Sequence, residues 1–220
     1  MRISEKLKLD AKDIWEKIYT HPFVIELFEG KLPIKKFKYY VVQDYNFLLG
    51  MTKATSILAS RAWNYELLKE ALTLAYNDVI IEMNSYTKLL HRLGLTLETV
   101  LKTEPAPTNI AYVNHVLVTC SLGSLMECLA SILPCFWTYM EIPKIHKELI
   151  KHNTNEIYRE WIKTYTSREY ILLTTNLIRL FDKYSKEEEY ERLKKAFITS
   201  SKYEWMFWDM SYKMEKWPVP

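Results

Sequence analysis

The sequence predicts an all-α protein, a helical bundle in which residues 1–220 form a single domain, and three observations support this prediction. Only 4 glycines occur in 220 residues, and the turn signals of β-hairpins are absent. Hydrophobic residues make up 49% of the chain and charged residues 26%, the balance of a folded protein with a sizeable core. Apolar residues recur at helical spacing along most of the chain.

The first part of the chain predicts three helical segments. Apolar spacing predicts a helix over residues 3–19: Ile3, Leu7, Ile14, Trp15 and Ile18. The His-Pro pair at 21–22 breaks this helix, and Gly30 ends the one or two turns that follow. Pro33 suits the first turn of a long helix that is expected to run to about Trp63.

The rest of the chain continues the helical pattern. A helix is expected from Tyr65 to Leu93, and Gly94 is a good residue to follow its C-terminus. The Pro-rich segment "KTEPAPTN" (102–109) is too short for a domain linker. Further helices are expected at about residues 109–121, 122–141, 143–151, 155–163, 167–184 and 187–215. All of these helices belong to one domain.

Charge and cysteine content bound the partners and the compartment. The net charge is +3 and no run of Lys and Arg forms a phosphate-binding stripe, so no nucleic-acid partner is expected. The charged, amphipathic start has no signal-peptide segment. The three cysteines, Cys120, Cys128 and Cys135, form neither a C-x-x-C pair nor an even disulfide framework. We therefore expect a cytoplasmic protein with reduced thiols.

One apolar segment is long enough to span a bilayer, with Glu127 as its single charged residue between Val116 and Met140. Glu127 and Pro134 within the segment argue against a membrane helix, and no positively charged flank sets an orientation. A central bundle helix that is apolar on all sides explains the segment as well, and we favour this interpretation, without membrane association.

Two carboxylates fall among apolar residues. Asp44 belongs to an apolar stripe of helical spacing: Phe37, Val41, Asp44, Leu48 and Met51. Glu204 lies in the aromatic segment "SSKYEWMFWDMSY" (200–212), where burial would raise its pKa toward the range of a general acid. Each carboxylate is either a structural group bonded to a neighbouring hydroxyl or a group that acts on a ligand. The high aromatic content, 14%, suits a pocket for a flat ring.

Cys135 is the third candidate. A cysteine in an apolar run is most often an inert core residue. Pro134, however, removes a backbone hydrogen bond and bends the helix beside Cys135, and Tyr139 lies one turn further on the same face. Cys120 and Cys128 lack such surroundings and are expected in the core.

Metal and nucleotide sites have no support in the spacing of the residues. The histidines form no i, i+4 pair, Glu-x-x-His is absent, and neither a Gly-rich phosphate loop nor G-x-S-x-G occurs. No metal and no cofactor are therefore expected.

Several motifs resemble those of the TenA/thiaminase II family, which has the haem-oxygenase-like helical fold. The resemblance runs along almost the whole chain, through "HPFV" (21–24), "GKLPIKKFKYYVVQDY" (30–45), "AYVNH" (111–115), "LPCFWTYMEI" (133–142), "REWIKTY" (159–165) and "SSKYEWMFWDMSY" (200–212).

The resemblance implies hydrolysis of 4-amino-5-aminomethyl-2-methylpyrimidine, or of thiamin, to 4-amino-5-hydroxymethyl-2-methylpyrimidine in thiamin salvage. It places the nucleophile at Cys135 and the acid at Glu204. It implies that Asp44 holds the aminopyrimidine, and that three tyrosines line the pocket: Tyr112, Tyr139 and Tyr165. Phe47 is expected to contact the substrate where the family often has a tyrosine that helps to activate the thiol. Tetrameric relatives suggest a homotetramer.

Two other functions stay open at this point. One is a non-haem iron oxygenase on the same fold, and the missing helix-borne histidines argue against it. The other is a non-catalytic protein that binds the pyrimidine.

Overall fold

The structure is a computed structural model that describes residues 1–77 and 83–219. Every regular element among these residues is a helix, which confirms the all-α prediction. The elements are α1 (Ile3–Asp10), α2 (Lys12–Tyr19), α3 (Pro22–Phe28), α4 (Ile34–Ser60), α5 (Tyr65–Tyr76), α6 (Met83–Arg92), α7 (Leu97–Lys102), α8 (Pro107–Leu122), α9 (Leu125–Ile145), α10 (Lys147–His152), α11 (Glu156–Tyr165), α12 (Arg168–Tyr184), η2 (Glu187–Glu189) and α13 (Tyr190–Lys213).

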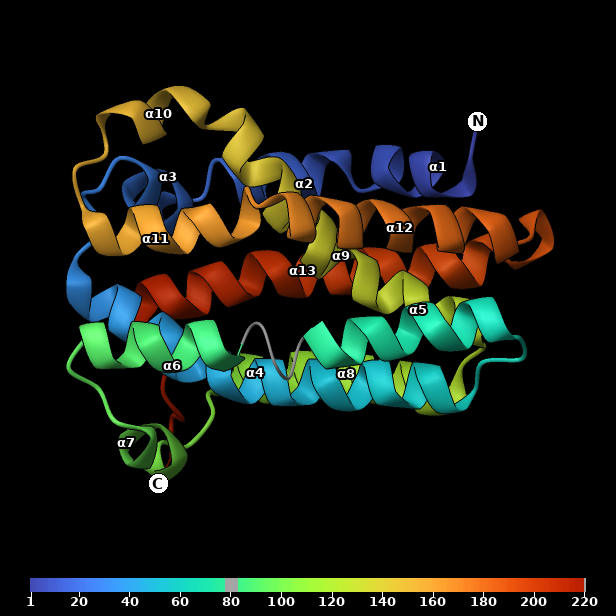
Figure 1. The fold of residues 1–220 in the computed structure, drawn as a ribbon, viewed down its shortest axis with the longest axis horizontal. Helices are drawn as coiled ribbons and strands as arrows, with labels where there is room; N and C mark the ends of the chain where they lie inside the picture. The colour runs from blue at the N-terminus through green and yellow to red at the C-terminus, as the bar shows by residue number, and fades with distance from the viewer. Residues whose placement is uncertain (78–82, 220) are drawn as a thin grey trace.

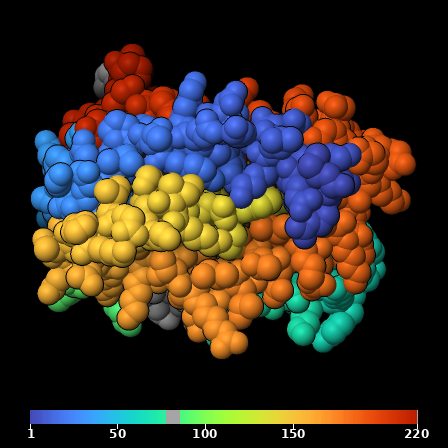
Figure 2. Space-filling view, turned by 90° about the horizontal axis from the view of Figure 1, so that it is seen from above, coloured from blue at the N-terminus to red at the C-terminus, as the bar shows by residue number. Residues whose placement is uncertain are grey.

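The C-terminal helix α13 runs through the middle of the bundle (Figure 1). It packs against α9, α8, α2 and α4, while α4 also packs against α5 and α8. Seen from above, the N-terminal helices, α10, α11 and α12 cover one face of the molecule (Figure 2). The site residues described below therefore lie on helices that meet inside the bundle.

The long apolar segment from Val116 to Met140 divides at Gly123 into the end of α8 and most of α9, and α9 is buried along most of its length. Its neighbours are α13, α12 and α8, so apolar residues on all sides of α9 find partners. No helix among residues 1–77 and 83–219 is long and apolar enough to cross a membrane. The segment lies inside the bundle, as expected, but it forms parts of two helices rather than one central helix.

Several predicted boundaries need correction. The helix expected over residues 3–19 divides at Ala11 into α1 and α2. Both helices pack on α13, and α1 is also bonded to α12 through Ser4 and Asp182. The break expected at residue 143 is absent: α9 continues through Pro143, whose burial in the core offsets the missing backbone hydrogen bond. Part of the helix expected from Tyr65 to Leu93 lies outside the described residues.

The expectation of reduced thiols is wrong for two of the three cysteines. Cys120 and Cys128 form a disulfide between the end of α8 and the start of α9. The tight turn at Gly123 brings the two helices together, so the Cα atoms of the pair are 4.2 Å apart. Cys135 is the cysteine outside this disulfide. Sequence spacing could not show that a turn would bring the other two side chains into contact.

Candidate active site

Glu204 lies on α13 in the interior, with 2% of its surface exposed. The hydroxyl of Tyr112, a fully buried residue of α8, donates a hydrogen bond of 2.6 Å to Oε1 of Glu204. Burial raises the pKa of Glu204 to about 7, although hydrogen bonds from Tyr112 and Cys135 lower it. Glu204 can therefore hold or release a proton near neutral pH.

Cys135 reaches Glu204 from α9, and its thiol hydrogen-bonds the Glu204 carboxyl. It follows Pro134 inside the helix and is partly exposed. Its side chain lines a small recess together with Tyr139, one helical turn away. Cys128 is buried in the disulfide and does not line this recess. The predicted difference in surroundings between Cys135 and the other cysteines is confirmed.

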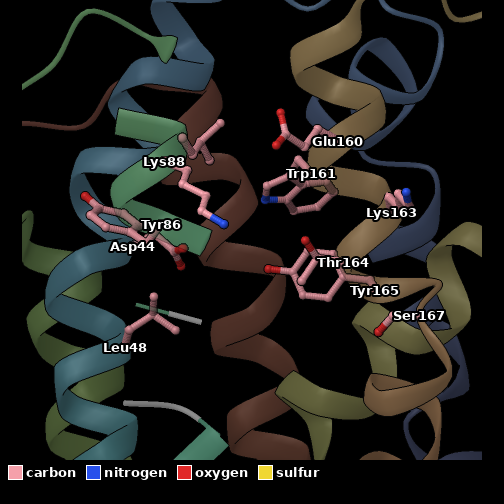
Figure 3. A pocket seen from close by; sticks show the side chains of 11 residues that line it. Asp44, Leu48, Tyr86, Lys88, Glu160, Trp161, Lys163, Thr164, Tyr165 and Ser167 are labelled. Atoms are coloured by element: carbon pink, nitrogen blue, oxygen red, sulfur yellow. The ribbon is translucent and has the colours of Figure 1, made fainter. Parts of the chain in front are cut away.

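The recess lies next to a larger cavity, with which it shares lining residues. The recess has a volume of about 20 Å³, room for about one water molecule. The outer cavity has a volume of about 310 Å³ and lies between α4 and α6 on one side and α11 on the other (Figure 3). Asp44, Leu48 and Tyr165 line both spaces, so these residues mark the passage from the surface to Cys135.

Asp44 lies on α4 and faces both cavities. It is half-buried rather than fully buried as its stripe predicted, because this face of α4 opens onto the passage. Burial first, and the nearby Asp44 charge second, raise the pKa of Tyr40 and of Tyr86. Asp44 and Tyr86 both line the outer cavity, whereas Tyr40 is fully buried in the core. A ligand with N–H donors could hydrogen-bond the Asp44 carboxylate from this cavity.

Gln43, the residue before Asp44, has a polar side chain that is buried in the core. Its Oε1 accepts hydrogen bonds from the Ala106 backbone N–H at 2.8 Å and from Asn109 at 3.0 Å. Sequence reasoning gave Gln43 no role, and its contacts show a structural one: it ties α4 to the start of α8.

Aromatic rings form the walls of the recess. Tyr139 stacks on Trp208 with 5.1 Å between ring centroids, and its ring lies 4.8 Å from that of Tyr165. The ring of Phe47 packs against that of Tyr112, with 4.9 Å between their centroids. Phe47, Tyr139 and Tyr165 all line the recess, and their contact with a substrate ring stays a prediction.

Tyr112 differs from the other predicted pocket tyrosines. It lines neither the recess nor the outer cavity, and its hydroxyl is spent on Glu204. Tyr112 therefore contacts the carboxyl of Glu204 in the interior, and its predicted contact with the substrate stays a prediction.

Sequence reasoning missed residues of the outer cavity. Trp161 on α11 and Lys88 on α6 face each other across it, and Tyr86 lies beside Asp44 (Figure 3). The "REWIKTY" segment, which ends in Tyr165, was the available signal for Trp161. Lys88 and Tyr86 lie on α6, where the sequence predicted no site residue.

Among the described residues, no group of three or more His, Cys, Asp or Glu side chains is placed to hold a metal ion. The chemistry that these residues offer is that of a thiol, a protonatable carboxyl beside it and a second carboxylate at the entrance.

A helical bundle with a thiol and a carboxyl in contact beneath aromatic walls defines a class: proteins with an internal site for a flat, polar small molecule. A model of the TENA/THI-4/PQQC family matches residues 9–214, and the chain belongs to this family. A protein of Halalkalibacterium halodurans named aminopyrimidine aminohydrolase is 32% identical over 220 residues, which cover 99% of this chain and 98% of that protein.

Two solved structures support the fold. A structure described as a TenA homologue protein from P. horikoshii OT3 has a TM-score of 0.93 and 45% identity, and the match covers 97% of this chain and 99% of that chain. A domain of Shewanella denitrificans with a heme oxygenase-like fold has a TM-score of 0.77 at 14% identity and covers 96% of this chain and 92% of that one. The predicted haem-oxygenase-like fold is confirmed.

Proposed function

We propose that the chain hydrolyses 4-amino-5-aminomethyl-2-methylpyrimidine to 4-amino-5-hydroxymethyl-2-methylpyrimidine and ammonia, and that it also cleaves thiamin at the same carbon. The name of the Halalkalibacterium relative, aminopyrimidine aminohydrolase, supports this activity. The observation that carries the proposal is the contact of the buried Glu204 with Cys135, which lines the aromatic recess, because it joins a proton donor to a nucleophile at the recess.

Substrate binding uses the passage between the two cavities. Asp44 accepts a hydrogen bond from the 4-amino group of the pyrimidine, and the rings of Tyr139 and Phe47 pack against its faces. The recess is smaller than a pyrimidine ring, so lining side chains such as Tyr165 move when the ring enters. The departing group then points toward the outer cavity.

The chemical steps use one proton that Cys135 and Glu204 share. The Cys135 sulfur adds to the pyrimidine ring while its proton passes to the ionised Glu204. Glu204 gives this proton to the amine, the C–N bond breaks, and ammonia leaves. Water adds to the exocyclic methylene and its proton returns to Glu204. The C–S bond then breaks and Cys135 regains its proton, so the enzyme ends the cycle unchanged.

This scheme also supplies the activation of the thiol. Phe47 has no hydroxyl to assist Cys135, but Glu204 is already hydrogen-bonded to the thiol and has a pKa of about 7. A base of that pKa accepts a thiol proton at neutral pH without a further partner.

The test is direct. Purified protein is incubated with the aminomethylpyrimidine, and ammonia and the hydroxymethylpyrimidine are measured over time. We expect both products in equal amounts. If the pyrimidine binds and neither product forms, the chain is a pyrimidine-binding protein and not an enzyme.

We also propose a cytoplasmic homotetramer, supported by resemblance to tetrameric relatives. Four chains of 26.3 kDa give a mass of about 105 kDa, which light scattering on a sizing column would measure. Disulfides are rare in the cytoplasm of most organisms but persist in that of hyperthermophiles. The disulfide between Cys120 and Cys128 is therefore compatible with a cytoplasmic location in a cell of that kind. Alkylation of thiols in acid-quenched cells would show whether the disulfide exists there.

A further inference from the structure

A chain of hydrogen bonds leads from Glu204 away from both cavities. Glu204 accepts from the Tyr112 hydroxyl at 2.6 Å, and Tyr112 is in turn hydrogen-bonded to Ser200. The Ser200 Oγ lies 3.1 Å from Nε2 of His115. Four side chains from α8 and α13 are thus connected in one line.

The inner part of this line is closed to water and the outer part is not. Tyr112 and Ser200 are fully buried, and neither lines the recess or the outer cavity. The Tyr203 ring covers the line, with its centroid 5.3 Å from that of Tyr112 and 5.5 Å from that of His115. His115 is half-buried, so the outer end of the line is partly exposed to solvent, and its ring also makes a hydrogen bond to the backbone of Ala196.

Each member of the line can pass a proton. A hydroxyl donates its own proton while it accepts another, and a neutral imidazole nitrogen donates or accepts according to its tautomer. Burial lowers the pKa of His115, so a proton that arrives on its ring is released readily. Rotation of the Tyr112 and Ser200 hydroxyls reverses the direction of the line.

The two leaving groups of the proposed reaction differ by one proton. When the aminomethylpyrimidine binds as the neutral amine, ammonia carries away the proton that Glu204 took from the thiol. When thiamin binds, the electron pair of the C–N bond goes to the thiazolium nitrogen, neutral thiazole leaves, and Glu204 keeps that proton. Thiamin cation and water therefore give hydroxymethylpyrimidine, thiazole and one proton. Glu204 can accept the proton of the incoming water only after it has lost the first.

We propose that Tyr112, Ser200 and His115 are a proton wire, which carries this surplus proton from Glu204 to the surface when a cationic heterocycle is the leaving group. The wire lets Glu204 ionise while substrate fills the passage to Cys135. Ser200 and His115 are positioning residues that act through Tyr112. The inference rests on the proposed function and defines the leaving-group class that needs these residues.

The primary test is Ser200→Ala, which removes the middle hydroxyl. We expect its kcat on thiamin to fall by about 10²-fold, in the range of a lost proton-transfer group, while kcat on the aminomethylpyrimidine falls by about threefold or less. Solvent deuterium should slow thiamin turnover more in this variant than in the wild type, because proton release becomes rate-limiting.

The neighbouring serine provides the matched control. Ser201 is as fully buried as Ser200, and its Oγ accepts a hydrogen bond of 2.9 Å from Trp15 instead. Ser201→Ala should leave the ratio of the two rates unchanged. Ser200→Thr keeps a hydroxyl and should restore thiamin turnover to within a few-fold of wild type.

His115 allows a rescue experiment. His115→Ala should lose thiamin turnover, and added imidazole should restore it in proportion to concentration, because a soluble base replaces the outer end of the wire. His115→Gln keeps a hydrogen-bonding side chain that binds no proton, so it should stay slow without imidazole. A side chain that served only for packing would give neither the dependence on leaving group nor the rescue.

Three outcomes would overturn the wire. Equal losses on both substrates would show that Ser200 only supports Glu204. Unchanged thiamin turnover in Ser200→Ala and His115→Ala would show that the proton leaves by the cavity. The third outcome is that the wild-type protein turns over the aminomethylpyrimidine but neither thiamin nor its pyridinium analogue. No surplus proton would then arise, and the wire would have no function. In that last case the proposed hydrolysis of the aminomethylpyrimidine stands and the proposed cleavage of thiamin does not, whereas absence of all turnover would contradict the proposed function as a whole.

Discussion

The hydroxyl of Tyr112 and the carboxyl of Glu204 form a hydrogen bond of 2.6 Å between two side chains that are almost completely buried. An ionised carboxylate in such a place needs donors, and Tyr112 and Cys135 supply them. The donors lower the pKa of Glu204 and burial raises it by more, so the result lies at about 7. This balance makes both protonation states available to the reaction.

The raised pKa predicts that stability depends on pH through Glu204. Between 4.5 and about 7 the folded protein keeps a proton that the unfolded chain has lost. The free energy of unfolding therefore falls as pH rises through this window, by about 3 kcal/mol at most. Glu204→Gln cannot ionise and should lack this contribution. Urea unfolding at pH 5 and pH 8 should show the variant gaining stability relative to wild type at pH 8. Parallel pH curves for the two proteins would contradict the raised pKa.

The cysteines give a second prediction: the thiol of Cys135 controls activity, whereas the disulfide between Cys120 and Cys128 contributes to stability. Cys135→Ser should nearly abolish turnover, because a hydroxyl is a much weaker nucleophile, and should leave the melting temperature close to wild type. The double change Cys120→Ser with Cys128→Ser opens a short loop and should cost roughly 2.5 kcal/mol of stability. Its turnover at 25 °C should persist. Equal activity in Cys135→Ser and in the double variant would rule out Cys135 as the nucleophile.

Asp44→Asn should weaken pyrimidine binding. The amide keeps the shape of Asp44 but loses the charge, so a hydrogen bond from the 4-amino group loses about 1.5–3 kcal/mol. Calorimetry with hydroxymethylpyrimidine would measure this loss as a higher Kd. Leu48 lines the same two cavities without a polar group, and Leu48→Met serves as the control for a change in shape alone. An unchanged Kd in Asp44→Asn would remove Asp44 from the binding site.

The helical fold and the pairing of Cys135 with Glu204 follow from different kinds of sequence information. Apolar spacing predicts helices because the period of the pattern is local. The contact between Cys135 and Glu204 joins α9 to α13, and the motifs of the family resemblance placed both residues in one site.

Other features depend on packing that spacing does not contain. The stripe on α4 placed Asp44 on the inner face, but only the arrangement of α11 and α6 decides that this face opens to a passage. Gln43, one residue earlier, proved to be the more buried side chain. The partnership of Ser200 with His115 likewise requires the register between α8 and α13.

The last prediction concerns Glu204→Gln, which keeps the shape of the side chain and removes its proton. In the proposed reaction Glu204 takes the thiol proton, gives a proton to the departing amine and accepts a proton from water. Thiamin needs the first and third of these transfers, and the amine needs all three. We therefore expect turnover to fall by about 10²–10⁴ with the aminomethylpyrimidine and by less with thiamin.

Ser200→Ala should give the opposite order, with the larger loss on thiamin, because it blocks proton release and leaves the acid in place. Measuring both variants on both substrates separates the two roles within one experiment. Equal losses of Glu204→Gln on both substrates would place its proton on the pyrimidine ring rather than on the leaving amine. A variant that melts at much lower temperature at pH 5, with full turnover per folded molecule, would make Glu204 structural.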